Sequence, residues 1–161
     1  STAQTEDAIA YDLAACFRNL TSGGERDLQP SASVLRNVTT GLGALFGVPA
    51  NITIETKIED VRLPAYKRRA LVLAASELVS NSLLHAFRGG SVGLIEVSLT
   101  ALGRTSACLH VGDNGNGFIE ASPNLDCGVG AGLAGLLEAD LVYDRMAGWT
   151  IAEIEFPLPG S

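Results

Sequence analysis

Three polar side chains recur at a regular interval in a largely apolar stretch of the sequence. Glu77, Asn81 and His85 recur at intervals of four residues within ALVLAASELVSNSLLHAF. On a helix this spacing places all three on one side. Glu77 could accept a proton or order a water, Asn81 offers a hard oxygen ligand suited to Mg²⁺, and His85 could donate to a phosphate. Taken alone, the stripe is also compatible with the exposed edge of an amphipathic helix.

A first glycine motif, DNGNGF at residues 113–118, follows directly from an apolar strand pattern. A plain turn needs about one glycine, whereas Gly115 and Gly117 at alternate positions favour a backbone that lies close to a ligand. Asp113 stands at the strand end, where a carboxylate can accept a hydrogen bond from an adenine amino group. A hairpin turn with Asn–Gly chemistry is the competing interpretation. A calcium loop fits poorly, since acidic ligands at spaced positions are missing.

A second glycine motif, GVGAGLAG at residues 128–135, precedes a short helix pattern. Its amides could wrap phosphates, and the N-terminus of the following helix would add a favourable field. The GxGxxG from Gly130 to Gly135 does not indicate a dinucleotide fold, because NLDC rather than a strand precedes the motif. A flexible lid without a ligand is the alternative.

The composition bounds the class of protein. The chain has 161 residues, 47% hydrophobic and 18% charged, which is enough for one domain with a real core. A net charge of −7 argues against a nucleic-acid partner. Three widely spaced cysteines without a CxxC pair argue against a disulfide or zinc scaffold and fit a reducing cytosol. No apolar run reaches the roughly 20 residues that span a bilayer, so we expect no membrane contact by this segment.

Hydrophobic periodicity predicts the elements that must position these motifs. We expect helices over residues 6–20, about 31–46, 64–87 and about 132–140. We expect strands around residues 52–54, 95–99, 107–111, 141–143 and 150–156, with Val61 and Leu63 as a hairpin partner of the first strand. Residues 21–30 are predicted to be a linker. This order predicts an α/β (α+β) two-layer sandwich, a mixed β-sheet covered on one face by helices.

Taken together, the motifs resemble those of a known superfamily. The ordered set ELVSNSLLHAF, DNGNGF, GVGAGL and GWT resembles the asparagine box and glycine boxes of the GHKL ATPases, which share the Bergerat ATP-binding fold. The resemblance covers roughly residues 29–157. It is greatest for histidine kinases whose asparagine box has the form NELVxNAxKHAF. The lead-in VRLPAYKRRALVLAASELVSN and the ending AEIEFP also look like that group.

The resemblance implies a role for each motif residue, with ATP and Mg²⁺ as the bound groups. Asn81 would coordinate the Mg²⁺ that bridges the phosphates, and Glu77 would polarise the acceptor or a water. Asp113 would bind the adenine amino group, partly through water. The remaining implied contacts are His85 near the phosphates, Gly115 and Gly117 at the base and ribose, Gly130, Gly132 and Leu133 at the lid and triphosphate, and Thr150 at the adenine.

The sequence departs from the family pattern in places within the asparagine box. Ser76 stands where the group often has Asn, and Leu84 stands where it usually has a basic residue. Leu84 removes one expected phosphate contact, for which Arg88 is a candidate substitute. The segment between Phe118 and Gly130 is short, which argues against gyrase-like or chaperone-like machines.

A histidine kinase also needs a phospho-acceptor. The two histidines are His85, within the asparagine box, and His110, which alternates along a strand and is expected to be a solvent-facing or satisfied sheet residue. We therefore expect residues 1–28 to be a helix and linker left from the second dimerisation helix, and residues 29–161 to be the ATP-binding catalytic domain. The γ-phosphate would pass to a His on a dimerisation helix outside this chain. The implied partners are that phospho-acceptor domain, a response regulator and a second copy in a homodimer, in the cytoplasm.

Two alternatives stay open. An anti-sigma-type serine kinase of the same superfamily would be a complete domain of similar length, although the long helix and linker before Pro30 favour the histidine kinase. A nucleotide-free adaptor with a decayed ATP site would account for Leu84. Nucleotide titration with and without Mg²⁺ separates the adaptor from both kinases.

Overall fold

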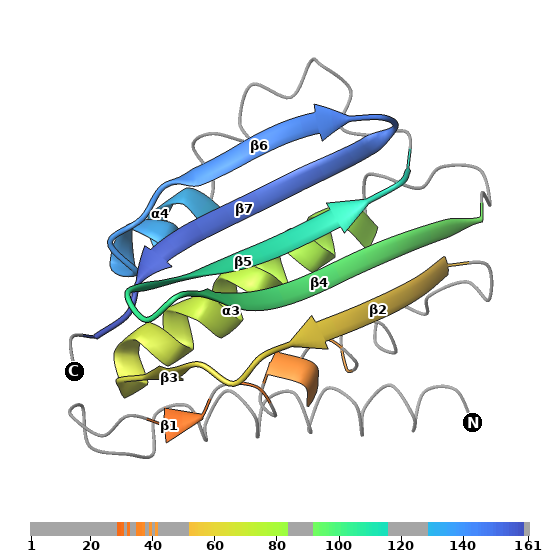
Figure 1. Ribbon diagram of the computed structural model, residues 1–161. Helices are drawn as coiled ribbons and strands as arrows, with labels where there is room; N and C mark the ends of the chain where they lie inside the picture. Colours follow the sequence, from red (N-terminus) through yellow and green to blue (C-terminus); the bar gives the residue numbers. More distant parts are fainter. Residues whose placement is uncertain are drawn as a thin grey trace.

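The computed structural model of the chain describes residues 29–30, 32, 35–37, 39, 41, 52–83, 92–115 and 129–159. In this part of the chain a five-stranded sheet carries its helices on one face (Figure 1). The elements are β1 (Gln29–Pro30), β2 (Ile52–Ile58), β3 (Arg62–Leu63), α3 (Ala65–Asn81), β4 (Gly93–Leu102), β5 (Ser106–Asp113), α4 (Val129–Leu136), β6 (Leu141–Met146) and β7 (Trp149–Pro157). The helix and linker predicted over residues 1–28 lie outside the described residues.

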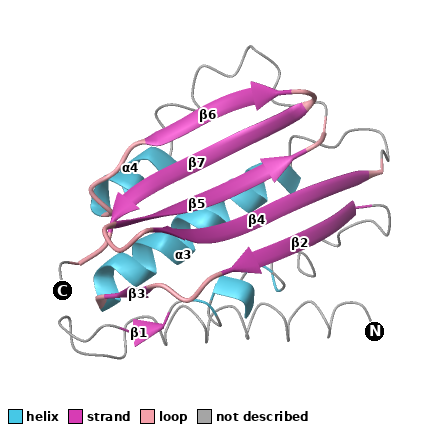
Figure 2. Cartoon of the chain, viewed as in Figure 1, coloured by secondary structure: helices cyan, strands magenta, loops and turns pink. Residues whose placement is uncertain are grey.

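The strands follow the order β2-β4-β5-β7-β6 in the main sheet. β2 pairs with β4 in parallel, whereas the other three neighbouring pairs are antiparallel. With the helices on one side of this sheet (Figure 2), the predicted two-layer sandwich with a mixed sheet is confirmed. Within the described ranges, no helix is both long enough and apolar enough to cross a bilayer.

The prediction that Val61 and Leu63 form a hairpin with the first strand is wrong. β3 pairs antiparallel with β1, so that Leu63 lies opposite Gln29, and β2 receives β4 as its neighbour instead. An alternating pattern identifies a strand but carries no information on which strand it pairs with. The predicted linker is also too long by two residues, because Gln29 and Pro30 belong to β1. Pro is tolerated there since an edge strand leaves one side of its backbone unpaired.

α3 is the element that carries the polar stripe. Pro64 is its N-cap in an extended conformation. The first backbone hydrogen bond of the helix runs from the Arg68 N–H to the Pro64 carbonyl at 2.9 Å. The α-helix ends at Asn81, and residues 82–83 continue in a wider π-helical turn. Such turns occur often at functional sites. The remainder of the helix predicted up to Phe87 lies outside the described residues.

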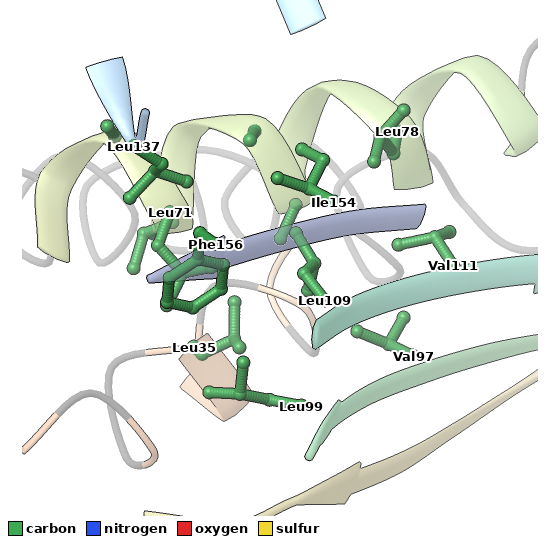
Figure 3. Packing of buried hydrophobic residues seen from close by; sticks show 14 of the residues in the cluster. Leu35, Leu71, Leu78, Val97, Leu99, Leu109, Val111, Leu137, Ile154 and Phe156 are labelled. Atoms are coloured by element: carbon green, nitrogen blue, oxygen red, sulfur yellow. The ribbon is translucent and has the colours of Figure 1, made fainter. Parts of the chain in front are cut away.

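The core holds α3 against the sheet (Figure 3). Alternate residues of β4, β5 and β7 point inward and are almost fully buried: Ile95, Val97, Leu99, Ala107, Leu109, Val111, Ala152, Ile154 and Phe156. α3 contributes Leu71 and Leu78, and Leu35 comes from the helical positions among residues 32–41. Burial of each large side chain stabilises the fold by about 1.5–3 kcal/mol. This packing fixes the C-terminal half of α3 relative to the ends of β5 and β7.

The opposite face of the sheet is polar. His110 Nδ1 lies 3.6 Å from the Glu153 carboxylate, in agreement with the prediction that His110 is a solvent-facing or satisfied sheet residue. Cys108 Sγ lies 3.5 Å from another oxygen of Glu153. Burial, followed by the charge of Glu153, raises the pKa of Cys108 to about 11. The thiol is therefore protonated at neutral pH and is a poor nucleophile.

Candidate functional site

A small pocket lies where the end of α3 meets the ends of β5 and β7. Its lining comes from four elements and comprises Leu78, Asn81, Ser82, Val111, Asp113, Tyr143, Thr150 and Ala152. Three predicted site residues, Asn81, Asp113 and Thr150, therefore share one pocket although they come from separate parts of the sequence. The asparagine-box helix and the start of the first glycine motif thus meet at this pocket.

Asp113 is the most buried polar group of this pocket, with 2% of its surface exposed. The Ser82 hydroxyl donates to Asp113 Oδ2 at 2.9 Å, and the Gly115 N–H donates to Oδ1 at 3.2 Å. Burial raises the pKa of the Asp113 carboxyl, while the Ser82 and Gly115 hydrogen bonds and the charge of Arg145 act in the opposite direction. A carboxylate can accept about four hydrogen bonds, so Asp113 keeps capacity for a donor on a ligand.

Thr150 lies directly opposite Asp113 in the pairing of β5 with β7. Its Oγ1 is buried and has no hydrogen-bond partner in the described structure. A buried hydroxyl without a partner costs about 1–3 kcal/mol, and most such groups in folded proteins are paired. The Thr150 hydroxyl is therefore suited to a water or to a polar ligand atom in this pocket.

The free space in the pocket is small. About 10 Å³ is open to the centre of a water molecule, which is room for about one ordered water. The pocket therefore cannot enclose a purine ring. It has room for one water that reaches Asp113 and Thr150, with a larger ligand outside it.

Glu77 and Asn81 lie one turn apart on the same side of α3, as predicted. Asn81 is half-buried and lines the pocket. Glu77 is also half-buried and lies beside the first turn of α4, where a Cβ added to Gly130 would come within 3.9 Å of Glu77 Cγ. His85, the third member of the stripe, lies outside the described residues.

The two glycine motifs have different local structures, a bend at Gly115 and a helix over Val129–Leu136. Gly115 contacts Asp113 through its N–H as part of the first motif, and Gly117 lies outside the described residues. In the second motif, the prediction of a loop before a helix that starts near residue 132 is wrong, because α4 begins at Val129. Gly130, Gly132 and Leu133 are therefore helical.

Close packing explains the glycine at position 130 of α4. A Cβ on Gly130 would approach Leu141 Cδ2 to 3.1 Å, with Leu78 Cδ2 at 3.9 Å. Glycine costs about 1 kcal/mol in a helix interior relative to Ala. At Gly130 the absence of a side chain lets α4 lie close to α3 and β6, so packing outweighs the low helix propensity. The glycine spacing alone could not separate this packing role from a phosphate loop.

Two polar residues of the pocket, Ser82 and Tyr143, were not predicted from the sequence. Ser82 contacts Asp113, yet a Ser in an apolar helix is also an ordinary back-bonding residue, as Ser76 is with the Val72 carbonyl. The available signal was that Ser82 stands where the family form NELVxNAxKHAF has Ala. Tyr143 lines the pocket from β6 and had only strand alternation as a signal.

A larger hollow of about 670 Å³ lies mainly on the outer side of the sheet, along β6 and β7. Four carboxylates contribute to its lining, from Asp140, Asp144, Glu153 and Glu155. Such a surface repels a triphosphate. The smaller pocket, with one partly compensated carboxylate, an amide and an unpaired hydroxyl, is therefore the better candidate for a nucleotide.

Comparisons with known proteins agree with this architecture. The histidine kinase domain of the Erythrobacter litoralis blue-light activated kinase EL346 is similar with a TM-score of 0.79 and 21% identity, over 96% of this chain and 80% of that one. Acinetobacter baumannii AdeS gives 0.60 and 14%, over 95% and 77%. The catalytic domain of ThkA gives 0.58 and 16%, over 82% and 96%. The chain has the fold of histidine kinase catalytic domains.

The predicted resemblance to histidine kinase catalytic domains is thus confirmed at the level of the fold. The chain spans about half, 53%, of a longer EL346 chain to which it is also similar. No family model matches the sequence, and no curated protein matches it.

In this histidine-kinase-type fold, the described residues contain no group of three or more His, Cys, Asp or Glu side chains placed to hold a metal ion. Mg²⁺ commonly binds through substrate phosphates and only one or two protein oxygens. The amide oxygen of Asn81, at the edge of the pocket, is a suitable single protein ligand of this kind.

Proposed function

We propose that the chain is the ATP-binding catalytic domain of a sensor histidine kinase, with the superfamily's Bergerat site between α3 and the ends of β5 and β7. The observation that carries the proposal is the pair formed by Asp113 and Thr150. A buried carboxylate with spare acceptor capacity lies opposite a buried hydroxyl that has no partner. Together they offer an acceptor and a second polar group to an adenine edge and one water.

At the purine end, Asp113 would accept a hydrogen bond from the adenine amino group, partly through water. Thr150 would complete the coordination of that water, because its Oγ1 lacks another partner. Gly115 supports the carboxylate through its N–H, and Ser82 orients the other oxygen. Because these two donors occupy only part of the hydrogen-bonding capacity of the ionised Asp113 carboxylate, it can accept a further hydrogen bond.

At the triphosphate end, Asn81 would hold Mg²⁺ together with the phosphates. His85, Gly117, Gly130, Gly132 and Leu133 remain the proposed contacts to ribose, lid and phosphates. Bound Mg²⁺ would neutralise the charge that develops on the γ-phosphoryl group. Glu77, one turn before Asn81, would lie on the side of the acceptor.

The reaction we propose is phosphoryl transfer to an imidazole of a separate dimerisation domain. The bond between the γ-phosphorus and the bridging oxygen breaks, and its electron pair leaves with ADP. A bond forms between the γ-phosphorus and one imidazole nitrogen, and the proton on the other ring nitrogen is lost. Glu77 is the carboxylate that we assign to accept that proton or to orient the ring. The phosphoryl group would then pass to a response regulator in the cytoplasm.

Calorimetric titration with ATP, with and without Mg²⁺, tests nucleotide binding. We expect binding that strengthens with Mg²⁺, and loss of the Mg²⁺ dependence in Asn81→Ala with adenosine binding retained. Absence of binding to the wild-type chain would instead support a nucleotide-free adaptor.

Incubation with labelled ATP tests the acceptor chemistry. We expect no label on this chain alone, and an acid-labile phosphohistidine on an added dimerisation domain. Acid-stable label on a Ser of a partner protein would identify the anti-sigma-type serine kinase instead.

A further inference from the structure

An ion pair joins the first turn of α3 to the turn that follows α4. Lys67 Nζ lies 3.2 Å from Glu138 Oε2. The two partners differ in environment, since the Lys67 side chain is 11% exposed and the Glu138 side chain is 68% exposed. A buried ammonium that loses its partner is left uncompensated, so Lys67 depends on Glu138.

Glu138 occupies a backbone position that favours glycine. It has a φ of 60°, in the left-handed region. The Ala139 N–H donates to the Ala134 carbonyl and the Glu138 N–H to the Gly135 carbonyl, which is the Schellman pattern of a helix end. Glycine is the common residue at this position because a Cβ costs about 1–2 kcal/mol there. A Glu at this point suggests a use for its side chain, and the contact with Lys67 supplies one.

The opposite end of α4 lies beside Glu77, one of the proposed catalytic residues. A Cβ added to Gly130, in the first turn, would lie 3.1 Å from Leu141 Cδ2 and 3.9 Å from both Glu77 Cγ and Leu78 Cδ2. α4 therefore runs antiparallel to α3, from Glu77 at one end to Lys67 at the other. The ion pair at Lys67 thus acts on the same helix whose first turn lies beside Glu77.

We infer that Lys67 and Glu138 are positioning residues for the phosphate half of the site. The inference rests on the proposed function. Their ion pair holds α4 against α3, so that Gly130 and Gly132 stand at a fixed place beside the triphosphate. The adenine half, built by Asp113, Ser82 and Thr150, does not depend on this tether.

Calorimetry with two ligands separates the two halves of the site. MgATP reports on both halves, whereas adenosine reports on the purine half alone. Glu138→Gln and Lys67→Met should each weaken MgATP binding by about threefold to fivefold, the range of a partly exposed ion pair. Adenosine affinity should stay unchanged, and the double variant should be no weaker than either single variant.

Glu138→Gly separates positioning from folding. It removes the tether but also relieves the left-handed backbone of a residue with a Cβ. We expect an unchanged or higher Tm together with the weaker MgATP binding of Glu138→Gln. A purely structural role for Glu138 would lower Tm and leave the ratio of MgATP to adenosine affinity intact. Glu153→Gln, which removes a carboxylate beside His110 on the outer face of the sheet, is the matched control and should change neither affinity.

Amide hydrogen exchange without nucleotide gives an independent measurement. The amides of α4 should exchange faster in Glu138→Gln than in the wild type, because the C-terminal end of the helix is released. Unchanged α4 exchange, or equal MgATP affinity in Glu138→Gln and the wild type, would overturn the inference and leave the proposed function intact. Failure of the wild-type chain to bind MgATP would overturn both.

Discussion

The carboxylate of Asp113 is buried, and the hydrogen bonds and charge of its neighbours only partly offset the cost of removing it from water. Because burial raises its pKa in the folded state, the folded protein holds the proton more tightly than the unfolded chain. The stability from this group is fully present at low pH and is lost as pH rises through the folded-state pKa. Asp113→Asn removes this loss, so its unfolding free energy relative to the wild type should increase as the pH rises above about 3.8, the ordinary pKa of the carboxyl.

Urea denaturation at several pH values measures this difference. A difference that does not vary with pH would contradict the raised pKa. The same variant should bind ATP more weakly by about 1–3 kcal/mol, since a hydrogen bond to a charged acceptor is lost. Greater stability with weaker binding is the signature expected of a functional rather than a structural carboxylate.

Thr150→Val tests the unpaired hydroxyl. Val has a similar shape, so the change removes a buried polar atom without opening a cavity. The unfolding free energy should stay the same or rise by up to about 1–3 kcal/mol, while adenosine binding should weaken by about 0.5–1.5 kcal/mol. Thr100→Val, at an exposed position of β4, is the matched control. Loss of stability in Thr150→Val would mean that the hydroxyl already has a partner in the free protein.

At the scale of single residues, the sequence predicted the polar groups better than their supports. Asn81, Asp113 and Thr150 stand in motifs whose spacing carries information, and they share the pocket. Ser82 and Tyr143 carry no such signal, because a lone Ser in a helix and a Tyr in a strand are ordinary residues there. Their roles depend on which elements meet in space, and no local pattern specifies that.

Among the elements, α4 gives the sharpest test of local packing. An added Cβ at Gly132 would meet nothing within 4 Å, whereas one at Gly130 would lie 3.1 Å from Leu141 Cδ2. Gly132→Ala should therefore stabilise the protein by about 0.5–1 kcal/mol, the gain in helix propensity. Gly130→Ala should gain less, because Leu141 must move. Equal gains in urea denaturation would show that Leu141 yields without cost.

Element types were predictable, but partners and ends were less so. The strands over 95–99, 107–111 and 150–156 were found because one face of each is buried, which enforces strict alternation. The two-residue strands β1 and β3 are too short to show a period, so their pairing was missed. The start of α4 was missed because glycines read as loop residues unless packing against α3 is known.

At the scale of the whole molecule, one core ties the site together. Phe156, with 0% exposure, packs among residues from the sheet and the helices (Figure 3). Phe156→Ala should lower the unfolding free energy by about 3–5 kcal/mol. Leu102→Ala, at an exposed position, should change it by about 0.5 kcal/mol or less.

The single tryptophan makes the cooperativity of this core measurable. Trp149 lies at the start of β7, so its fluorescence reports on that edge, while far-UV circular dichroism reports on all elements. In Phe156→Ala both signals should change at the same urea concentration, because a single core unfolds as a unit. Separate midpoints would mean that the β6–β7 edge unfolds independently.

The parallel pairing of β2 with β4 has a consequence for how the chain assembles. The β4–β5 and β6–β7 hairpins close over short turns, but β2 reaches β4 only after the chain has passed through β3 and α3. The entropy of closing that long crossover must be met before its contacts form. The antiparallel strands should therefore pair first during folding, and β2 should pair with β4 last. In partial unfolding, β2 should be the first strand to separate from the sheet. Strands β5 and β7, which line the proposed nucleotide site, would thus be paired before β2 adds to the edge of the sheet.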